Sequence, residues 1–391
     1  MPNDRNETGT HVIASLGGEE TGPTLIVFGS LHGNEAAGAE ALRRVGADLD
    51  ATPVELQGRV YFLAGNVRAL AAGVRFIDAD LNRHWTPENV VRNLPDTAIP
   101  PQLSEDKEQA ELLEILLPLL ESARDEVYAL DLHSTSAEGV PFATVGDTLR
   151  NRAFAQKFPI TVLLGIEEQL EGTLLEYLNN MGVVTLGFEG GQHYAESTVE
   201  THAALVKLAL VHSGIADRSA IDVAEAEEAL GRATGRRRIV EVRYRQPIDE
   251  GDDFEMRPGF ENFDPVKKGQ VLATQNGLDV KAVESGMVMM PLYQKLGEDG
   301  FFLAREVAGF WIWLSGVLRR LRIGDLMPIL PGVRRSEKRF DILEIDTSIA
   351  RFFPLQIFHL LGFRKLRWSE DRLVVSRRKY DRKGPFVERG K

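Results

Sequence analysis

The chain has 391 residues, of which 43% are hydrophobic and 27% charged, a composition typical of globular proteins and long enough for two or three domains. It contains no cysteine, so disulfides are excluded and any metal must be held by His, Asp or Glu. The net charge of −12 argues against non-specific nucleic-acid binding. Because neither a secretory leader nor an apolar run of membrane-spanning length is visible, we expect a cytoplasmic protein without a membrane span.

The charge is distributed unevenly along the chain. Residues 318–391 carry 19 Lys and Arg against 9 Asp and Glu, a net charge of +10, and the remaining residues carry −22. This asymmetry predicts that residues 309–391 form a separate basic extension. Its apolar and basic residues are interspersed without a periodic stripe. This favours a packing extension with a solvated basic face over a contact with anionic lipid, nucleic acid or a partner subunit.

The first 235 residues alternate strand-like and helix-like patterns, which predicts βα units on a largely parallel or mixed sheet. Apolar runs typical of buried strands occupy 24–29, 59–65, 126–133 and 182–189. Patterns typical of helices occupy 34–49, 104–123 and 197–212, and an acidic, alanine-rich linking helix is expected at 216–233. Ser104 is the expected N-cap of the second helix.

Short strands separated by Gly, Pro and Asp turns follow a break at 235–238 and continue to about residue 306. Within this stretch, 265–273 and 284–288 resemble the half-barrel repeats of lipoyl- and biotin-carrier domains. The turn at 274–277 lacks the lysine that a carrier would need, so we interpret the region as a structural β-module without a prosthetic group. The predicted domains are therefore 1–235, 236–308 and 309–391.

A histidine and a glutamate follow the first buried strand at a spacing that suits a metal ion. His32 and Glu35 lie where open α/β sheets build their sites, at the end of a strand. A third ligand is expected at another strand end, and His133 fits, with Asp131 two residues earlier to orient its ring. Two histidines and a glutamate are a standard set for catalytic zinc. The alternative for His133 is a buried histidine with its hydrogen bonds satisfied.

Glu189 ends the strand predicted at 182–189, where a buried carboxylate is costly unless it has a task or a partner. We expect either a general base, which deprotonates a water activated by the metal, or the partner of a local arginine. Residues Arg75, Asn82 and Arg83 lie within one nine-residue stretch. They could bind a carboxylate and stabilise an oxyanion, or the arginines could simply pair with the neighbouring aspartates.

These stretches, in this order, resemble the motifs of the aspartoacylase and succinylglutamate desuccinylase family, within the zinc carboxypeptidase-like clan. The matching motifs are His32-Gly33-Asn34-Glu35, Asp80-Leu81-Asn82-Arg83, Asp131-Leu132-His133 and Glu189-Gly190. The resemblance covers about residues 24–306. It implies a zinc carboxypeptidase-like α/β catalytic domain with a mixed sheet, followed by a smaller C-terminal all-β domain of barrel-sandwich type.

The resemblance also implies roles for individual residues. One Zn²⁺ per chain would bind to His32, Glu35 and His133, with Glu189 as the base and Arg75 as the clamp on the scissile carbonyl; Asn82 and Arg83 would hold a substrate carboxylate. One departure is visible, because aspartoacylase places a tyrosine from its C-terminal domain in the substrate pocket. Here residues 296–302 contain none, and Tyr293 lies upstream, so the acyl group is left open.

The expected function is zinc-dependent hydrolysis of the amide bond of a small N-acyl amino acid, by a desuccinylase, a deacetylase or an enzyme for a larger acyl group. The enzyme could form a homo-oligomer. One alternative is a zinc carboxypeptidase that acts on a peptide or peptidoglycan fragment and needs an open groove. The other is a non-catalytic binding protein on the same fold.

Overall fold

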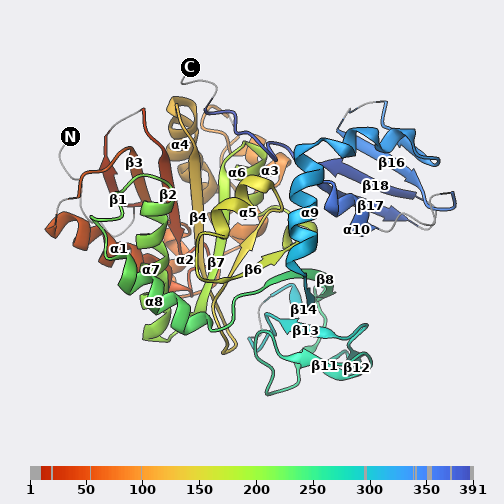
Figure 1. The fold of residues 1–391 in the computed structure, drawn as a ribbon. Helices are drawn as coiled ribbons and strands as arrows, with labels where there is room; N and C mark the ends of the chain where they lie inside the picture. The colour runs from red at the N-terminus through yellow and green to blue at the C-terminus, as the bar shows by residue number, and fades with distance from the viewer. Residues whose placement is uncertain are drawn as a thin grey trace.

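The computed structural model describes residues 10–18, 21–52, 54–97, 99–294, 297–337, 339, 341–349, 355–369 and 372–387. Within these residues an 11-stranded mixed sheet runs through the molecule in the order β1-β3-β2-β4-β7-β5-β6-β8-β14-β13-β10. Figure 1 shows an α/β part, a small β part below it and a C-terminal unit to one side.

The α/β part contains the four strands and four helices predicted for it, together with shorter elements that were not predicted. Its strands are β1 (Val12–Gly17), β2 (Thr24–Gly29), β3 (Arg59–Ala64), β4 (Val127–Thr135), β5 (Phe142–Val145), β6 (Thr161–Leu164) and β7 (Val184–Gln192). Its α-helices are α1 (Ala36–Ala51), α2 (Val67–Ala72), α3 (Pro87–Arg92), α4 (Ser104–Ser122), α5 (Leu149–Ala155), α6 (Leu174–Asn180), α7 (Glu196–His212) and α8 (Val223–Thr234). Two 3₁₀ turns, η1 (Leu81–Arg83) and η2 (Ile166–Glu168), lie between them.

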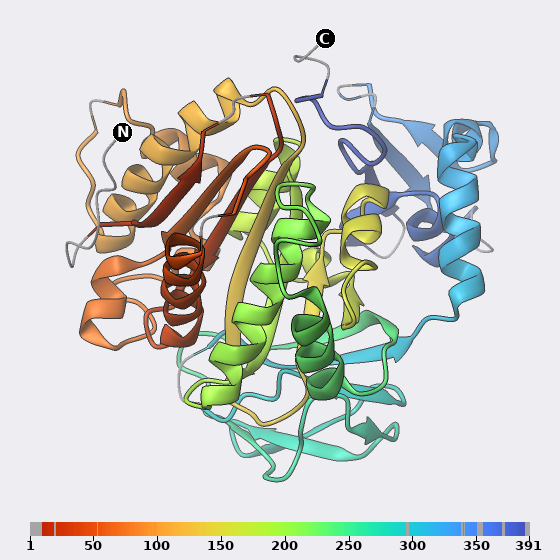
Figure 2. The ribbon, with the colours of Figure 1, turned by 60° about the vertical axis from the view of Figure 1, so that its left-hand side comes forward.

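Helices cover both faces of the central strands, which explains why those strands are apolar throughout. Every residue of β2 is buried. Figure 2 shows α1, α7 and α8 on one face, where their side chains share a core with β3, β4 and β7. Helices α4 and α6 contribute to a second core with β2 and β4. Burial on both faces removes the polar alternation that a half-exposed strand would show.

The small β part continues the large sheet. Strand β8 (Ile239–Pro247) pairs in parallel with β6, and it is followed in the sheet by β14 (Asp299–Glu306), β13 (Gly286–Met289) and β10 (Pro265–Val266). Strands β9 (Phe254–Met256), β11 (Val271–Gln275) and β12 (Leu278–Lys281) form a separate three-stranded sheet. The large sheet therefore crosses the break predicted near residue 235. The predicted fold class, a mixed-sheet α/β part followed by a smaller β part, is confirmed.

The C-terminal unit, residues 309–387, has a sheet and a hydrophobic core of its own. It comprises α9 (Gly309–Arg320), η3 (Ile323–Ile329), β15 (Val333–Arg335), β16 (Ile342–Asp346), α10 (Leu355–Leu360), β17 (Phe363–Ser369) and β18 (Arg372–Arg377). Its four strands form an antiparallel sheet in the order β15-β16-β18-β17. Phe358, Phe363 and Val375 are fully or almost fully buried in its core. The interspersed pattern that predicted a packing extension thus belongs to a folded unit.

The last described residues of the C-terminal unit pack away from its own sheet. After β18 the chain returns to the α/β part, and Phe386 packs into the core that contains Leu178 and Val183.

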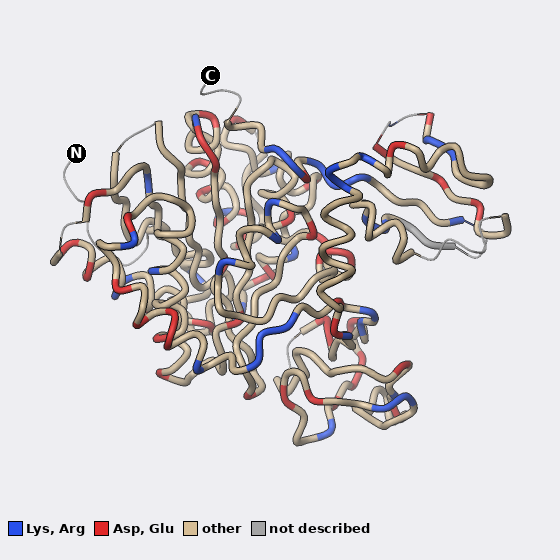
Figure 3. Tube along the Cα trace, viewed as in Figure 1, with Lys and Arg blue, Asp and Glu red and all other residues tan. Residues whose placement is uncertain are grey.

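Figure 3 shows Lys and Arg concentrated where the unit joins the rest of the molecule. Some of these are buried, since Arg319 and Arg378 have side chains only 1% and 5% exposed. No helix in the described part of the chain is long and apolar enough to cross a bilayer.

Candidate functional site

Parallel pairing brings the predicted strand-end residues together. Strand β4 lies between β2 and β7 and is parallel to both, so that the carboxyl ends of all three lie at one edge of the sheet. His133 and Glu189 are paired in register on β4 and β7, and His32 and Glu35 follow β2. A pocket of about 460 Å³ lies there. It is lined by all seven predicted site residues: His32, Glu35, Arg75, Asn82, Arg83, His133 and Glu189.

His32, Glu35 and His133 are arranged as a set of metal ligands. The Nδ1 atoms of His32 and His133 lie 2.8 and 3.1 Å from the two carboxylate oxygens of Glu35. Each residue offers one possible ligand atom, and these three atoms all lie within 4.8 Å of one another. All three residues are buried. The chemistry of this set, two imidazoles and a carboxylate, fits a divalent cation such as zinc.

Two further carboxylates hold the outer nitrogens of these histidines. His133 Nε2 lies 2.6 Å from Asp131, as expected from the sequence, and His32 Nε2 lies 3.1 Å from Asp80. A carboxylate that accepts the Nε2–H proton leaves Nδ1 free to bind a metal and fixes the ring. The role of Asp80 was not predicted, because its place beside two arginines indicated only an ion pair.

The charge of the group also favours a cation. Burial opposes ionisation of Glu35, but His32 and His133 outweigh it and hold the pKa of Glu35 well below its usual value. The backbone N–H of Ser134 donates to the same carboxylate at 2.9 Å. Burial lowers the pKa of His133, whereas Asp131 and Glu35 raise it to well above its usual value. Bound metal would take the place of the proton that these carboxylates attract.

Glu189 lies beside this group without a partner for its charge. Burial, reinforced by the charges of Glu35 and Asp131, raises the pKa of Glu189 to about 8. Its Oε2 atom is buried and has no hydrogen-bond partner among the described residues. The expected alternative, an ion pair with a local arginine, is not found within the described part of the chain. A buried carboxylate with a vacant oxygen is suited to accept a proton.

Of the two arrangements predicted for the arginine-rich stretch, the structure shows ion pairs, and binding of a carboxylate or an oxyanion stays a prediction. Arg75 donates to Asp80 at 2.9 Å, and its Nη1 lies 3.7 Å from Glu35, so that the ion pair itself faces the metal ligands. The Asn82 side-chain oxygen accepts the backbone N–H of Leu174 at 3.1 Å. Arg83 donates to Asp299 of β14 at 2.8 Å, which ties the small β part to the pocket.

Glu105, which was not predicted, holds the loop that carries Arg75 and Asn82. Helix α4 begins at Ser104, with Leu103 rather than Ser104 at the N-cap position, so that Glu105 lies in its first turn. Its fully buried carboxylate accepts the backbone N–H groups of residues 77, 78 and 79 at 2.8 to 3.1 Å. It also accepts the Asn66 amide at 3.1 Å. An acidic residue early in a helix usually interacts with the helix dipole, so no sequence pattern indicated this role.

His202 supports the site by contacting the strands that carry His133 and Glu189. It lies on α7, and its Nε2 is 2.9 Å from the backbone oxygen of His133, a contact that was not predicted. Burial lowers the pKa of His202 to about 4, so the ring is neutral. It packs against Gly190, where a Cβ atom would lie 2.4 Å from His202 Nε2. The glycine after Glu189 is the signal that could have indicated this close approach.

Two further histidines, His193 and His11, lie outside the group formed by His32, Glu35 and His133. His193 lines the pocket, with its Nδ1 2.8 Å from Ser134 Oγ. His11 lies near Glu108 and Glu111, a second group with metal-ligand spacing. Arg68 is already paired with this second group, because its guanidinium lies 2.6 Å from the carboxylate of Glu108 and 2.7 Å from that of Glu111.

No tyrosine lines the pocket among the residues that the structure describes. The hydroxyl of Tyr293 is used by the small β part, where it accepts the backbone N–H of Phe260 at 2.8 Å. Asp299, Glu298 and Gln294 occupy the adjoining wall instead. The predicted departure from the aspartoacylase pattern is thus present in the structure.

The comparisons with known proteins agree with these motifs. Residues 21–213 match the family model for the succinylglutamate desuccinylase/aspartoacylase catalytic domain. Over 71 residues the chain is 35% identical to the succinylglutamate desuccinylase of Pseudomonas paraeruginosa, and over 84 residues 32% identical to that of Yersinia enterocolitica. These segments cover 18% and 22% of this chain, and only 21% and 26% of those relatives.

Solved structures show the same fold. The product-bound ectoine utilization protein EutE (DoeB) from Ruegeria pomeroyi aligns with a TM-score of 0.53 and 23% identity, over 74% of this chain and 86% of that one. The succinylglutamate desuccinylase from Chromobacterium violaceum aligns with a TM-score of 0.52 and 18% identity, over 75% and 88%. Residues 21–213 of the chain therefore belong to the succinylglutamate desuccinylase/aspartoacylase family of hydrolases, and the solved structures share its fold.

Proposed function

We propose that the protein is a zinc-dependent amidohydrolase that removes the acyl group from an N-acyl amino acid. The observation that supports this most directly is the position of Glu189. Its unpartnered carboxylate oxygen lies in the same pocket as a buried His-Glu-His group. A metal-binding protein without catalysis would gain nothing from a buried, unpaired carboxylate, because such a group destabilises the fold.

Each of these residues has a separate role in the proposed hydrolysis. A zinc ion held by His32, Glu35 and His133 would polarise the scissile carbonyl and lower the pKa of water to ~7. Glu189 accepts a proton from the attacking water and returns it to the leaving amine. Arg75, fixed by Asp80, shares the negative charge that develops on the carbonyl oxygen.

Asn82 and Arg83 would bind the carboxylate of the amino-acid half. Both line the pocket, and Arg83 keeps donors beyond the one used by Asp299. The walls that the small β part and the C-terminal unit add to the pocket favour a small substrate over a long peptide. A panel of N-acyl amino acids, screened beside short peptides, distinguishes this proposal from the carboxypeptidase alternative.

The decisive variant is Glu189→Gln, which keeps the shape of the side chain but cannot accept the proton. We expect kcat to fall by about 10²–10⁴-fold, with the zinc content of the purified protein unchanged. The control is Glu200→Gln on α7, an exposed carboxylate that lies outside the pocket lining and should keep full turnover. Near-full turnover by the Glu189 variant would refute the mechanism.

A further inference from the structure

The pocket continues well beyond the metal ligands, along strand β7. Side chains at alternate positions of a strand point to the same face, and Glu189, Gly187 and Thr185 all line the pocket. Four residues of extended strand span ~13 Å. Gly187 pairs with Thr144 of the neighbouring strand β5, and a Cβ atom at residue 187 would lie 2.4 Å from the Thr144 hydroxyl, so this wall has no room for a larger side chain.

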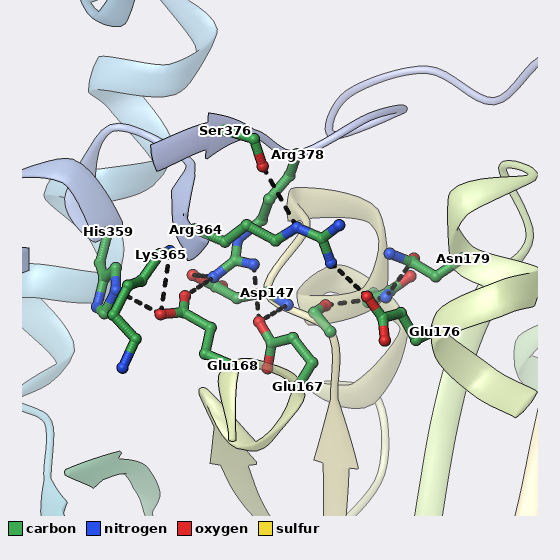
Figure 4. A network of polar contacts seen from close by, with 12 residues as sticks. Asp147, Glu167, Glu168, Glu176, Asn179, His359, Arg364, Lys365, Ser376 and Arg378 are labelled. Atoms are coloured by element: carbon green, nitrogen blue, oxygen red, sulfur yellow. Dashed lines mark hydrogen bonds and ion pairs between the residues drawn. The ribbon is translucent and has the colours of Figure 1, made fainter. Parts of the chain in front are cut away.

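The far end of the pocket is formed jointly by α6 and the C-terminal unit. Arg364 of β17 donates to Glu176 of α6 at 2.7 Å and to Ser376 at 3.4 Å. The Asn179 oxygen accepts the Asn151 amide at 2.9 Å. Figure 4 shows Arg364 reaching from the C-terminal sheet towards α6, with Asn179 beside Glu176. Arg364 Nη2 and the Asn179 side-chain nitrogen have no hydrogen bond within the described residues, so both remain available as donors.

Basic residues outnumber acidic ones in the lining at this end, but most of them are ion-paired: Arg339 with Asp341, Arg377 with Asp325, and Arg378 with Glu167 and Glu168. The C-terminal unit contributes one acidic residue to the lining, Asp341, and five basic ones: Arg339, Arg364, Arg377, Arg378 and Lys379. The α/β part adds the carboxylates of Glu167 and Glu176. Lys379, which has no ion pair among the described residues, and the free Nη2 group of Arg364 favour an anionic ligand, and the planar guanidinium of Arg364 suits a carboxylate.

Buried ion pairs fix this wall in place. Arg378, which follows β18, contacts Glu167 at 2.7 Å and Glu168 at 2.8 Å. His359 of α10 contacts Glu168 at 2.9 Å (Figure 4). These contacts anchor the C-terminal unit to η2, which also lines the pocket. A donor held in position loses little freedom when it binds a ligand, so its contribution to affinity is retained.

We propose that the C-terminal unit determines acyl specificity. In this proposal the acyl chain extends along β7 from the metal centre and ends in a carboxylate bound by Arg364 and Asn179. The substrate class is thus an N-acyl amino acid with a long ω-carboxyacyl group. This inference rests on the proposed function, because it places the scissile carbonyl beside Glu189. A short acyl group would leave the far end of the pocket empty.

Binding of free dicarboxylates tests the proposed acyl specificity without catalytic turnover. Succinate, suberate and sebacate, together with octanoate as a monocarboxylate control, are titrated calorimetrically into the zinc-loaded full-length protein. We expect the best long dicarboxylate to bind at least about tenfold more tightly than succinate and than octanoate, a difference of about 1.4 kcal/mol. Arg364→Gln should abolish this preference and leave succinate affinity unchanged. Arg335→Gln, at an exposed position of β15 away from the pocket, should retain it.

Each outcome is decisive. If wild-type affinity does not depend on chain length or on the second carboxylate, the inference is wrong, whether or not any variant folds. It is also wrong if the folded Arg364 variant keeps the preference. Failure of the proposed function is separate, because it appears as absence of amide hydrolysis across the substrate panel. If hydrolysis occurs without preference for long dicarboxylates, only the present inference is overturned.

Discussion

At the scale of single residues, the site depends on side chains that hold backbone as much as on those that face the substrate. Glu105 receives three backbone N–H groups from the loop that carries Arg75. We predict that Glu105→Ala lowers the free energy of unfolding by about 3 kcal/mol, because buried donors lose their acceptor. It should also lower kcat/KM about 100-fold, since misplacement by ~1 Å has such an effect. Urea unfolding and steady-state kinetics measure the two quantities.

Glu108 offers a matched control one turn along the same helix. It is also fully buried, and it accepts backbone N–H groups from Val67 and Arg68, at 2.8 and 3.1 Å. Glu108→Ala should therefore lose comparable stability while kcat/KM of the folded protein changes little. Equal kinetic losses in both variants would show that general destabilisation, and not the loop, explains the effect of Glu105.

At the scale of elements, the buried strands and the candidate metal site at their ends could be predicted from the sequence. Apolar runs such as 24–29 and 182–189 have few alternatives in an α/β protein, and parallel pairing then fixes which strand ends meet. Strands β5 and β6 have four residues each, too few to stand out by pattern. The contributions of Asp80 and His202 depend on contacts across 48 and 69 residues of sequence, which no local pattern reports.

The junction between α10 and η2 predicts a pH dependence of stability. Burial lowers the pKa of His359, but hydrogen bonds to Glu168 and Glu241 more than offset this and raise it to about 9. Because the folded-state pKa lies above the unfolded value of ~6.5, the protonated ring stabilises the fold fully below pH ~6.5. This contribution is lost as the pH rises through about 9.

We therefore predict that the free energy of unfolding falls by up to about 3 kcal/mol more in the wild type than in His359→Gln when the pH rises from 6 to 10. Urea titrations of both proteins across this range measure the difference. Comparing the two proteins cancels other titrating groups, including Glu189. Parallel pH profiles would mean that His359 does not act through its charge.

At the scale of the whole molecule, the three parts are joined by more than their linkers. The large sheet passes from β6 to β8, and Arg83 of the α/β part is bonded to Asp299 of β14. The last segment of the chain then returns to the core of the first part, where Phe386 is 2% exposed. Basic composition alone could not predict this return, since a single phenylalanine near the end of a charged segment has no periodic signature.

We predict that Phe386→Ala lowers the stability of the α/β part by about 3–5 kcal/mol, the range for loss of a buried phenylalanine. Hydrogen exchange should rise in β4 and α6 as well as in the C-terminal segment. Val387→Ala, at the adjacent and 36% exposed position, should change stability by less than about 0.5 kcal/mol. Faster exchange confined to residues after β18 would contradict this prediction.

The position of Phe386 also has a consequence for synthesis on the ribosome. Phe386 follows every proposed site residue in the sequence, so it is synthesised well after the candidate metal ligands. Final packing of the α/β part must therefore await synthesis of the C-terminal unit. A product truncated before residue 386 would carry every proposed catalytic residue and still lack a complete core, so translation beyond residue 386 is a condition for a stable fold.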